Sequence, residues 1–486
     1  MNKLLNKYQD FNFSDIFKLN FTYLLIAFVS VSLLIVDVFL LSYLNLELFI
    51  LPSVLVLTII PFFFIYPKFW LYTVTFSTFI FFGESDKGIS TLDIITGLFF
   101  VGGLFVWFFC EIFINKRRII ENHWEFLYLF LYLIIPFFYF ALYEHLLFLD
   151  FIRGYLLYVL VLYYFPMKKI LTTYEDWNIF VIVFLSSIFI SSVKQIYYYY
   201  TNVIQNLLYA YQIGSSIRTN QLLFTYAINF IFLFLFEVKS NLNKIILFLF
   251  LSFNIIALIT SFSRIFWIMT FICTIITFLT YSFRNKIKFI IILLLSLSLF
   301  LFSIKLFLKD NFKIGLQVLE NRITSSSKGT KDISAEARFV EWEKVIKLIG
   351  ESPLLGQGFN KVYSHNSPID DYTINYSTIH NGYLFLFYNY GIPAGLIILY
   401  LFFSKFYQSI FLLFKTRDIQ NKKLLLFAIY SLLVFFVVSF FTSEFHKRDD
   451  VFLIPLIFAL VTFVDNNIKN ENIITENTKK NASKIN

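Results

Sequence analysis

Charged residues are scarce in this sequence. Lys, Arg, Asp and Glu make up 15% of its 486 residues, whereas hydrophobic residues make up 58% and aromatic residues 22%. The mean hydropathy is +0.73. Soluble globular proteins carry about 25% charged residues, so this composition excludes that class. Lipid is therefore the solvent for most of the chain.

Several chemical signatures are also missing. The only cysteines, Cys110 and Cys273, lie in separate apolar tracts, so no disulfide framework is indicated. No GxxxxGK, GxSxG or HExxH motif occurs, which argues against an ATP-driven enzyme, a serine hydrolase and a zinc protease. Asp370 and Asp371 lack the further oxygen ligands that a divalent cation needs. We expect no metal and no cofactor.

Long apolar tracts fill most of the chain, and each is about as long as the helix that crosses ~30 Å of hydrocarbon. They predict an all-α polytopic membrane protein with about 12–14 transmembrane helices. The predicted spans are 21–43, 46–66, 69–83, 91–114, 124–144, 151–166, 178–199, 220–237, 244–261, 264–282, 288–308, 379–403, 424–442 and 450–465. Eleven of them fill residues 21–308 and three fill residues 379–465.

The placement of Lys and Arg predicts the orientation. If residues 1–20 are cytoplasmic, most cations fall in inner segments, because short loops resist carrying cations across the membrane. The short outer loops then hold only Lys87, Arg153, Arg218, Arg264, Lys447 and Arg448. Both termini are predicted to be cytoplasmic, with a disordered polar tail at 466–486. The net charge of +9 thus reflects topology, and we expect membrane lipids but no nucleic acid as partners.

One large loop, residues 309–378, is predicted to lie outside the cytoplasm. Within it, Ser334 can cap a short helix that Gly350 ends. Phe339, Trp342, Ile346 and Ile349 are spaced to form one apolar stripe along that helix.

Three arginines fall on the outer side, where the topology otherwise keeps cations few. Arg218 and Arg264 begin predicted spans, and Arg338 lies in the loop helix. Guanidinium groups match phosphate oxygens and do not lose their charge, so these side chains suit an anionic partner. Lipid headgroups explain Arg218 and Arg264 as well, and Arg338 has Glu341 and Trp342 one turn away as local partners.

His380 is the outer residue best suited to accept a proton near neutral pH. It stands directly after the loop and beside the polar Asn381. A structural role is the common alternative for an isolated histidine. His365 shares the His–Asn dipeptide but lies among turn-forming residues, so we rank it below His380.

The order of these motifs resembles the O-antigen ligase family, which includes bacterial polysaccharide polymerases. Arg218, the Ser263–Arg264 pair, RFVEWEKVIKLIGESPLLGQGF from Arg338 and HNGYLFLFYNYG from His380 carry the resemblance. It implies a multi-pass protein of the bacterial inner (cytoplasmic) membrane that needs no cofactor or metal.

The resemblance also implies an activity. Glycan would move from undecaprenyl diphosphate to a hydroxyl of a glycan or lipid-core acceptor, with inversion at the anomeric carbon. Arg218, Arg264 and Arg338 would hold the diphosphate, and His380 would activate the acceptor, with Ser263 and Asn381 in support.

The sequence leaves other functions open. The sequence does not distinguish a polymerase that extends repeat units from a ligase that attaches finished glycan. A transporter or flippase of lipid-linked oligosaccharides would place functional charges at mid-membrane, whereas the candidates here gather on one side. An envelope scaffold would bind partners through the outer loop without catalysis.

Overall fold

The computed structural model confirms an all-α polytopic membrane protein. It describes residues 67–81, 98–136, 138, 158–199, 201, 220–308, 333–359, 361–366, 373–376, 379–442, 444–445 and 447–485. The spans predicted at 21–43 and 46–66, and Arg218, lie outside these residues.

Helices make up nearly all of the described structure. The first half contains α5 (Pro67–Phe81), η2 (Leu98–Gly102), α7 (Gly103–Phe109), η3 (Cys110–Ile114), α8 (His123–Leu129), η4 (Phe130–Ile134), η5 (Leu160–Tyr163), α11 (Tyr164–Ile170) and α12 (Tyr174–Tyr198). The second half contains α14 (Gln221–Phe234), α15 (Asn241–Thr260), α16 (Arg264–Thr280), α17 (Phe283–Leu308), α19 (Ile333–Glu351), β1 (Tyr363–Asn366), β2 (Thr373–Tyr376), α20 (Gly382–Lys415), α21 (Ile419–Ser439) and α22 (Arg448–Ile485).

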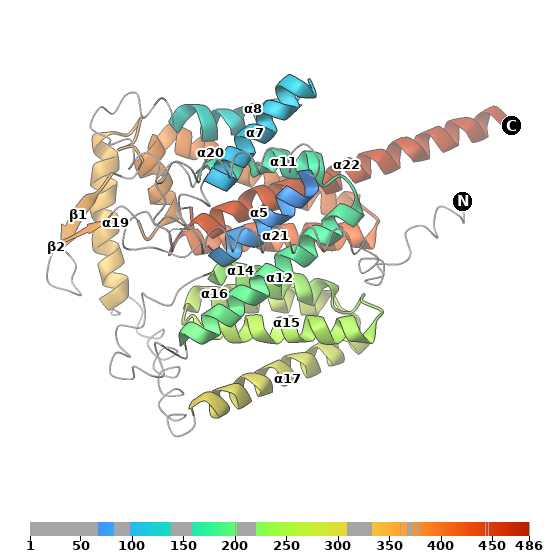
Figure 1. Ribbon diagram of the computed structural model, residues 1–486, viewed down its shortest axis with the longest axis horizontal. Helices are drawn as coiled ribbons and strands as arrows, with labels where there is room; N and C mark the ends of the chain where they lie inside the picture. The colour runs from blue at the N-terminus through green and yellow to red at the C-terminus, as the bar shows by residue number, and fades with distance from the viewer. Residues whose placement is uncertain are drawn as a thin grey trace, which may run out of the picture.

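Among the described residues, five helical stretches are long and apolar enough to cross a membrane. They are Tyr174–Tyr198, Asn241–Thr260, Gly382–Lys415, Ile419–Ser439 and Asp450–Glu471. Most helices share one general direction, whereas α19 and the β1–β2 hairpin stand across one end of the bundle (Figure 1). The two strands pair antiparallel, with Tyr363 opposite Tyr376.

Contacts between α14 and α16 show that these two helices run parallel. Near their first residues, the Thr270 hydroxyl donates to the Thr225 hydroxyl oxygen at 3.0 Å. Near their last residues, the Tyr281 hydroxyl donates to the Phe232 carbonyl. The starts of α14 and α16 therefore lie at the same end of the bundle.

The helix α21 runs the other way. Tyr226, early in α14, donates to the carbonyl of Ser431, past the middle of α21, at 2.6 Å. Lys423, early in α21, donates to the carbonyl of Leu233, late in α14, at 2.8 Å. Since α20 precedes α21 through the short connection 416–418 and packs against it, α20 starts at the same end as α14 and α16.

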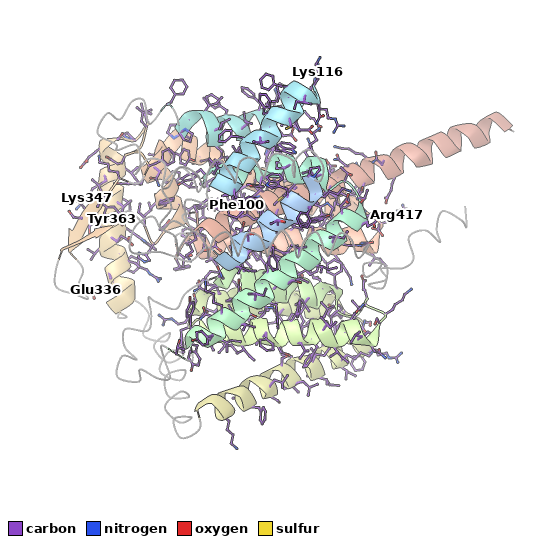
Figure 2. All side chains as sticks on the ribbon, in the orientation of Figure 1. Phe100, Lys116, Glu336, Lys347, Tyr363 and Arg417 are labelled. Atoms are coloured by element: carbon purple, nitrogen blue, oxygen red, sulfur yellow. The ribbon has the colours of Figure 1, made fainter. Side chains whose placement is uncertain are left out.

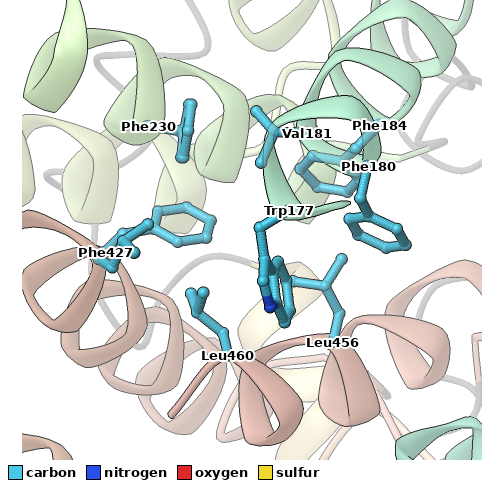
Figure 3. Close-up of a pocket in the computed structure, with 9 residues that line it drawn as sticks. Trp177, Phe180, Val181, Phe184, Phe230, Phe427, Leu456 and Leu460 are labelled. Carbon is cyan, nitrogen blue, oxygen red and sulfur yellow. The ribbon is translucent and has the colours of Figure 1, made fainter. Parts of the chain in front are cut away.

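Aromatic side chains fill the space between the helices (Figure 2). Where α12, α14, α21 and α22 meet, Trp177, Phe180, Phe230 and Phe427 surround a gap of only about 10 Å³ (Figure 3). A gap of this size is a packing defect and has no room for a lipid chain.

The helix α20 is broken in its first third, at Gly391 (φ 76°, ψ 168°), two residues before Pro393. This backbone region is open almost only to glycine. The break frees the carbonyl of Tyr388 and the N–H of Ile392, which a continuous helix would join. Inside a membrane protein, both groups need other partners.

The segment after α19 supplies those partners. Gln357 donates its N–H to the Tyr388 carbonyl at 2.6 Å, and the Ile392 N–H donates to the Pro353 carbonyl at 2.8 Å. The two chains approach so closely that a Cβ on Gly391 would lie 2.3 Å from the Leu354 carbonyl oxygen. The segment from Pro353 to Gln357 is therefore fastened to α20 through backbone hydrogen bonds.

Two helices near the C-terminus run beyond the spans predicted for them. α20 continues to Lys415, whereas the predicted span ends at residue 403. Lys405, in this extension of α20, is buried. Its ammonium lies 4.4 Å from the centre of the Trp124 ring and donates to the Thr462 hydroxyl at 3.1 Å, and these contacts stabilise the buried charge.

The tail predicted to be disordered at 466–486 is instead helical, because α22 continues to Ile485. This stretch contains neither glycine nor proline to stop a helix, and Lys469 pairs with Asp465 one turn before it at 2.8 Å.

Candidate functional site

A buried carboxylate and a histidine form the centre of the candidate site. Glu341 comes from the middle of α19, and its side chain is 3% exposed. Its oxygens lie 3.2 and 3.3 Å from Nδ1 of His380, and the backbone N–H of His380 donates to both oxygens at 3.3 Å. Glu341 on α19 therefore fixes both the backbone and the ring of His380.

Tyr363, on β1, completes this arrangement. Its hydroxyl donates to Glu341 Oε1 at 2.6 Å, and its ring lies 5.8 Å from the ring of Tyr388 on α20. Three chain segments that are distant in sequence thus meet at one carboxylate.

The hydrogen bonds decide the charge of Glu341. Burial by itself would raise its pKa, but hydrogen bonds and charge interaction with His380, together with the Tyr363 hydroxyl, outweigh burial and lower the pKa below its ordinary value. Glu341 is therefore ionised at neutral pH. The His380 side chain, in contrast, is 48% exposed, so it reaches the surface while its partner stays inside.

Asn381 has a clear structural role. It is the N-cap of α20, and its side-chain oxygen accepts from the N–H groups of Tyr383 and Leu384, both at 3.0 Å. The cap fixes where the helix begins, and so it fixes the position of His380, the residue before it.

Arg264 is the first residue of α16 and is half-buried. It follows a tight turn in which Phe262 has a positive φ of 52°, and Ser263 is buried in extended conformation without capping the helix through its side chain. The indole N–H of Trp267 donates back to the Leu258 carbonyl at 2.8 Å and holds the turn. Arg264 lies at the same end of the bundle as His380.

Three candidate residues remain: Arg338, Arg218 and His365. Arg338 is half-buried on α19, one turn before Glu341, so it belongs to the same loop helix. Arg218 falls outside the described residues, three positions before the first residue of α14 described as helix. His365, the alternative histidine, lies on β1 opposite Ile374.

The predicted apolar stripe on α19 is buried only in part. Its Phe339 and Ile346 are 50% and 56% exposed, whereas its Ile349 turns inward together with Glu341 and Val345. A carboxylate can occupy the buried face because His380 and Tyr363 bind it. The spacing Glu341–Val345–Ile349 was visible in the sequence, but its partners were not.

Residues 245–399 match the O-Antigen ligase family model, Wzy_C. The match confirms the resemblance for about a third of the chain. No curated protein matches the chain.

The part of the chain that matches the O-antigen ligase model contains most of the candidate residues. It includes Arg264, Arg338, Glu341 and His380, and the α20 break at Gly391, whereas Arg218 precedes it. The match supports a membrane enzyme that ligates or polymerises glycan.

Proposed function

We propose that this protein transfers glycan from undecaprenyl diphosphate to an acceptor hydroxyl on the outer face of the bacterial inner membrane. The observation that carries the proposal is the Glu341–His380 pair, because it lies in the matched segment and has the geometry of an oriented general base.

Glu341 acts as a positioning residue in this mechanism. When Nδ1–H of His380 donates to the carboxylate, Nε2 becomes the ring nitrogen that accepts a proton. The negative charge of Glu341 also stabilises the imidazolium that forms after the transfer. The burial of Glu341 keeps it from turning away from the ring.

The reaction itself needs one displacement. His380 removes the proton of the acceptor hydroxyl while the hydroxyl oxygen attacks the anomeric carbon of the donor. The bond from that carbon to the diphosphate oxygen breaks, and undecaprenyl diphosphate leaves with both electrons. Attack from the side opposite the leaving group inverts the anomeric configuration.

Arginines would stabilise the charge that grows on the departing diphosphate. Arg264 is suited to this role because it is half-buried at the end of the bundle where His380 lies, and partial dehydration strengthens such contacts. We assign Arg218 and Arg338 the same role, Arg338 because it shares α19 with Glu341.

The test uses purified protein in lipid vesicles with a diphosphate-linked glycan donor, candidate acceptors and a chelator. We expect release of undecaprenyl diphosphate together with a longer or newly attached glycan. Products that form a ladder from donor alone indicate a polymerase, whereas product that requires added lipid core indicates a ligase. No turnover with any acceptor contradicts the proposal and favours transport.

Matched variants separate the roles. His380→Ala should lose about 10²–10⁴-fold in kcat, the usual contribution of a general base, whereas His365→Ala should keep activity. Arg264→Ala should lose activity, while Arg284→Ala, in the first turn of α17 at the opposite end of the bundle, should not. Full activity of Arg264→Ala would refute its assignment to the diphosphate.

A further inference from the structure

The helix α19 and the turn after it expose apolar side chains at the end of the bundle. Phe339 and Ile346, two turns apart, lie on the same side of α19. In the turn that follows, Leu354 and Leu355 are 71% and 47% exposed. We call these residues the lateral patch. Exposed apolar residues that are scattered singly are common, but a group of them on one helix and its turn marks a surface with an apolar partner.

The charged residues of α19 point in a different direction. Glu343 and Lys347 pair at 2.8 Å, and their side chains are 71% and 68% exposed. At about 100° per residue, this pair lies roughly opposite the buried row that contains Glu341. Phe339 and Ile346 lie about 110° to one side of that row. Since the buried row packs against α20, the ion pair points away from the bundle and the apolar residues point sideways.

The orientation of α19 gives this sideways direction a meaning. The helix stands across one end of the bundle, so its axis is roughly parallel to the membrane plane (Figure 1). A direction sideways from such a helix runs along the membrane surface. Interfacial helices have this arrangement, with the polar side toward water and the apolar side in the boundary between headgroups and acyl chains. What remains to be established is the depth of the lateral patch.

The contact with α20 indicates that depth. The Ile392 N–H donates to the Pro353 carbonyl, and the next carbonyl, that of Leu354, lies against Gly391. From Ile392 to Lys415, α20 rises about 35 Å at 1.5 Å per residue, which is enough to cross ~30 Å of hydrocarbon. Gly391 and Leu354 therefore lie near the boundary between hydrocarbon and headgroups.

The lateral patch also continues the lipid-facing surface of α20. Exposed apolar residues follow one face of this helix at intervals of three or four, namely Ile392, Leu396, Tyr400 and Phe403. In a spanning helix, an exposed apolar face contacts acyl chains. Because Leu354 lies beside the first of these residues, the lipid-facing surface passes from α20 onto the turn after α19.

We propose that α19 and the turn after it insert the lateral patch into the lipid leaflet on the side of His380. The two leucines contact acyl chains, the two α19 residues lie where acyl chains meet headgroups, and the Glu343–Lys347 pair faces water. Lipid thus holds the loop helix in addition to α20, and the Glu341 carboxylate stays at the level of the membrane surface. The proposal does not depend on glycosyl transfer.

The test attaches a nitroxide spin label to single positions of the full-length protein in vesicles of phosphatidylethanolamine and phosphatidylglycerol. Cys110 and Cys273 are replaced by alanine, so that only the introduced cysteine carries the label. The reporters are Ile346→Cys and Leu354→Cys, whose exposure leaves room for the label. The collision rate of the label with O₂, which concentrates in hydrocarbon, is compared with its collision rate with a water-soluble nickel chelate.

Two further positions are the matched controls. Leu396→Cys, on the exposed face of α20, gives the ratio of the two collision rates in lipid. Glu343→Cys, on the side of α19 that faces away from the bundle, gives the ratio in water. We expect the O₂-to-nickel ratio at both reporters to be several-fold higher than at Glu343→Cys and to approach the ratio at Leu396→Cys.

Three results would overturn the proposal. Ratios at both reporters equal to that at Glu343→Cys show that the lateral patch faces water. A lipid-like ratio at Leu354→Cys alone confines insertion to the turn and excludes α19. Low collision rates with both reagents show that protein covers the patch, which points to a second copy of the chain. Phe339→Cys reports on the same side of α19, so it replaces Ile346→Cys where that label lowers the unfolding midpoint.

Discussion

Glu341→Gln removes the charge that orients His380 and changes almost no volume. The Nδ1 of His380 lies 3.2 and 3.3 Å from the two carboxylate oxygens, longer than the ~2.7–2.9 Å of the strongest charge-assisted bonds. We therefore take the lower part of the ~1.5–3 kcal/mol that a hydrogen bond to a charged group contributes, about 1.5–2 kcal/mol. At 1.36 kcal/mol per tenfold, kcat should fall roughly 10- to 30-fold.

The assay is steady-state transfer with saturating donor and acceptor, which separates kcat from KM. Because Glu341 is 3% exposed beneath His380, it should affect kcat and leave the KM for the donor nearly unchanged. A change confined to KM would point to a binding role for Glu341.

A double variant provides the sharper control. Glu341 acts through His380 in this mechanism, so adding Glu341→Gln to His380→Ala should cause no further loss. Full activity of Glu341→Gln, or losses that multiply in the double variant, would refute the reasoning. A monodisperse variant with unchanged helix content excludes simple misfolding as the cause.

Three further outcomes follow from the same contacts. Tyr363→Phe removes the 2.6 Å hydrogen bond to Glu341, and it should lower kcat several-fold and lower the thermal unfolding midpoint; an unchanged variant would show that the hairpin does not support the site. Gly391→Ala should destabilise the protein by about 3 kcal/mol or more, because its Cβ would meet the Leu354 carbonyl at 2.3 Å in a glycine-only conformation. Gly350→Ala is the control: its Cβ meets nothing within 4 Å, so its midpoint should stay the same or rise. The pKa of Glu341 is lower in the folded state than its value of about 4.3 in the unfolded state, so ionised Glu341 stabilises the fold at a pH above about 4.3. This stabilisation is lost as the pH falls through the lower pKa of the folded state. The advantage of the wild type over Glu341→Gln in unfolding midpoint should therefore be full at pH 7 and shrink below about pH 4; a constant difference would contradict an ionised Glu341.

The sequence predicted helices well where hydropathy changes sharply. The spans expected at 220–237, 244–261 and 264–282 agree with α14, α15 and α16 to within three residues. Polar residues bound these tracts, and a polar residue at the end of an apolar tract marks the membrane surface. The predicted span ended at residue 403 for the same reason, because a lysine that follows an apolar tract is taken to mark the membrane surface. The sequence does not show that Lys405 packs against the Trp124 ring.

The site was predictable only in part. His380 could be selected from its chemistry and its place after the loop. Glu341 could not, because the residues that make its burial tolerable, Tyr363 and His380, are 22 and 39 positions away along the chain. An acidic residue on an apolar helix face was the local signal, but only tertiary contacts show that it has partners. The β1–β2 hairpin was missed, since its strands are four residues each.

The break in α20 has a consequence for how the protein is made. An unbroken hydrophobic helix satisfies its own backbone and can enter the bilayer alone. α20 cannot do so around Gly391, where the Tyr388 carbonyl and the Ile392 N–H depend on the segment between Pro353 and Gln357. The backbone of α20 around Gly391 is therefore satisfied only once that segment has docked against it. Completion of this spanning helix is thus coupled to the folding of the segment that precedes it in the chain.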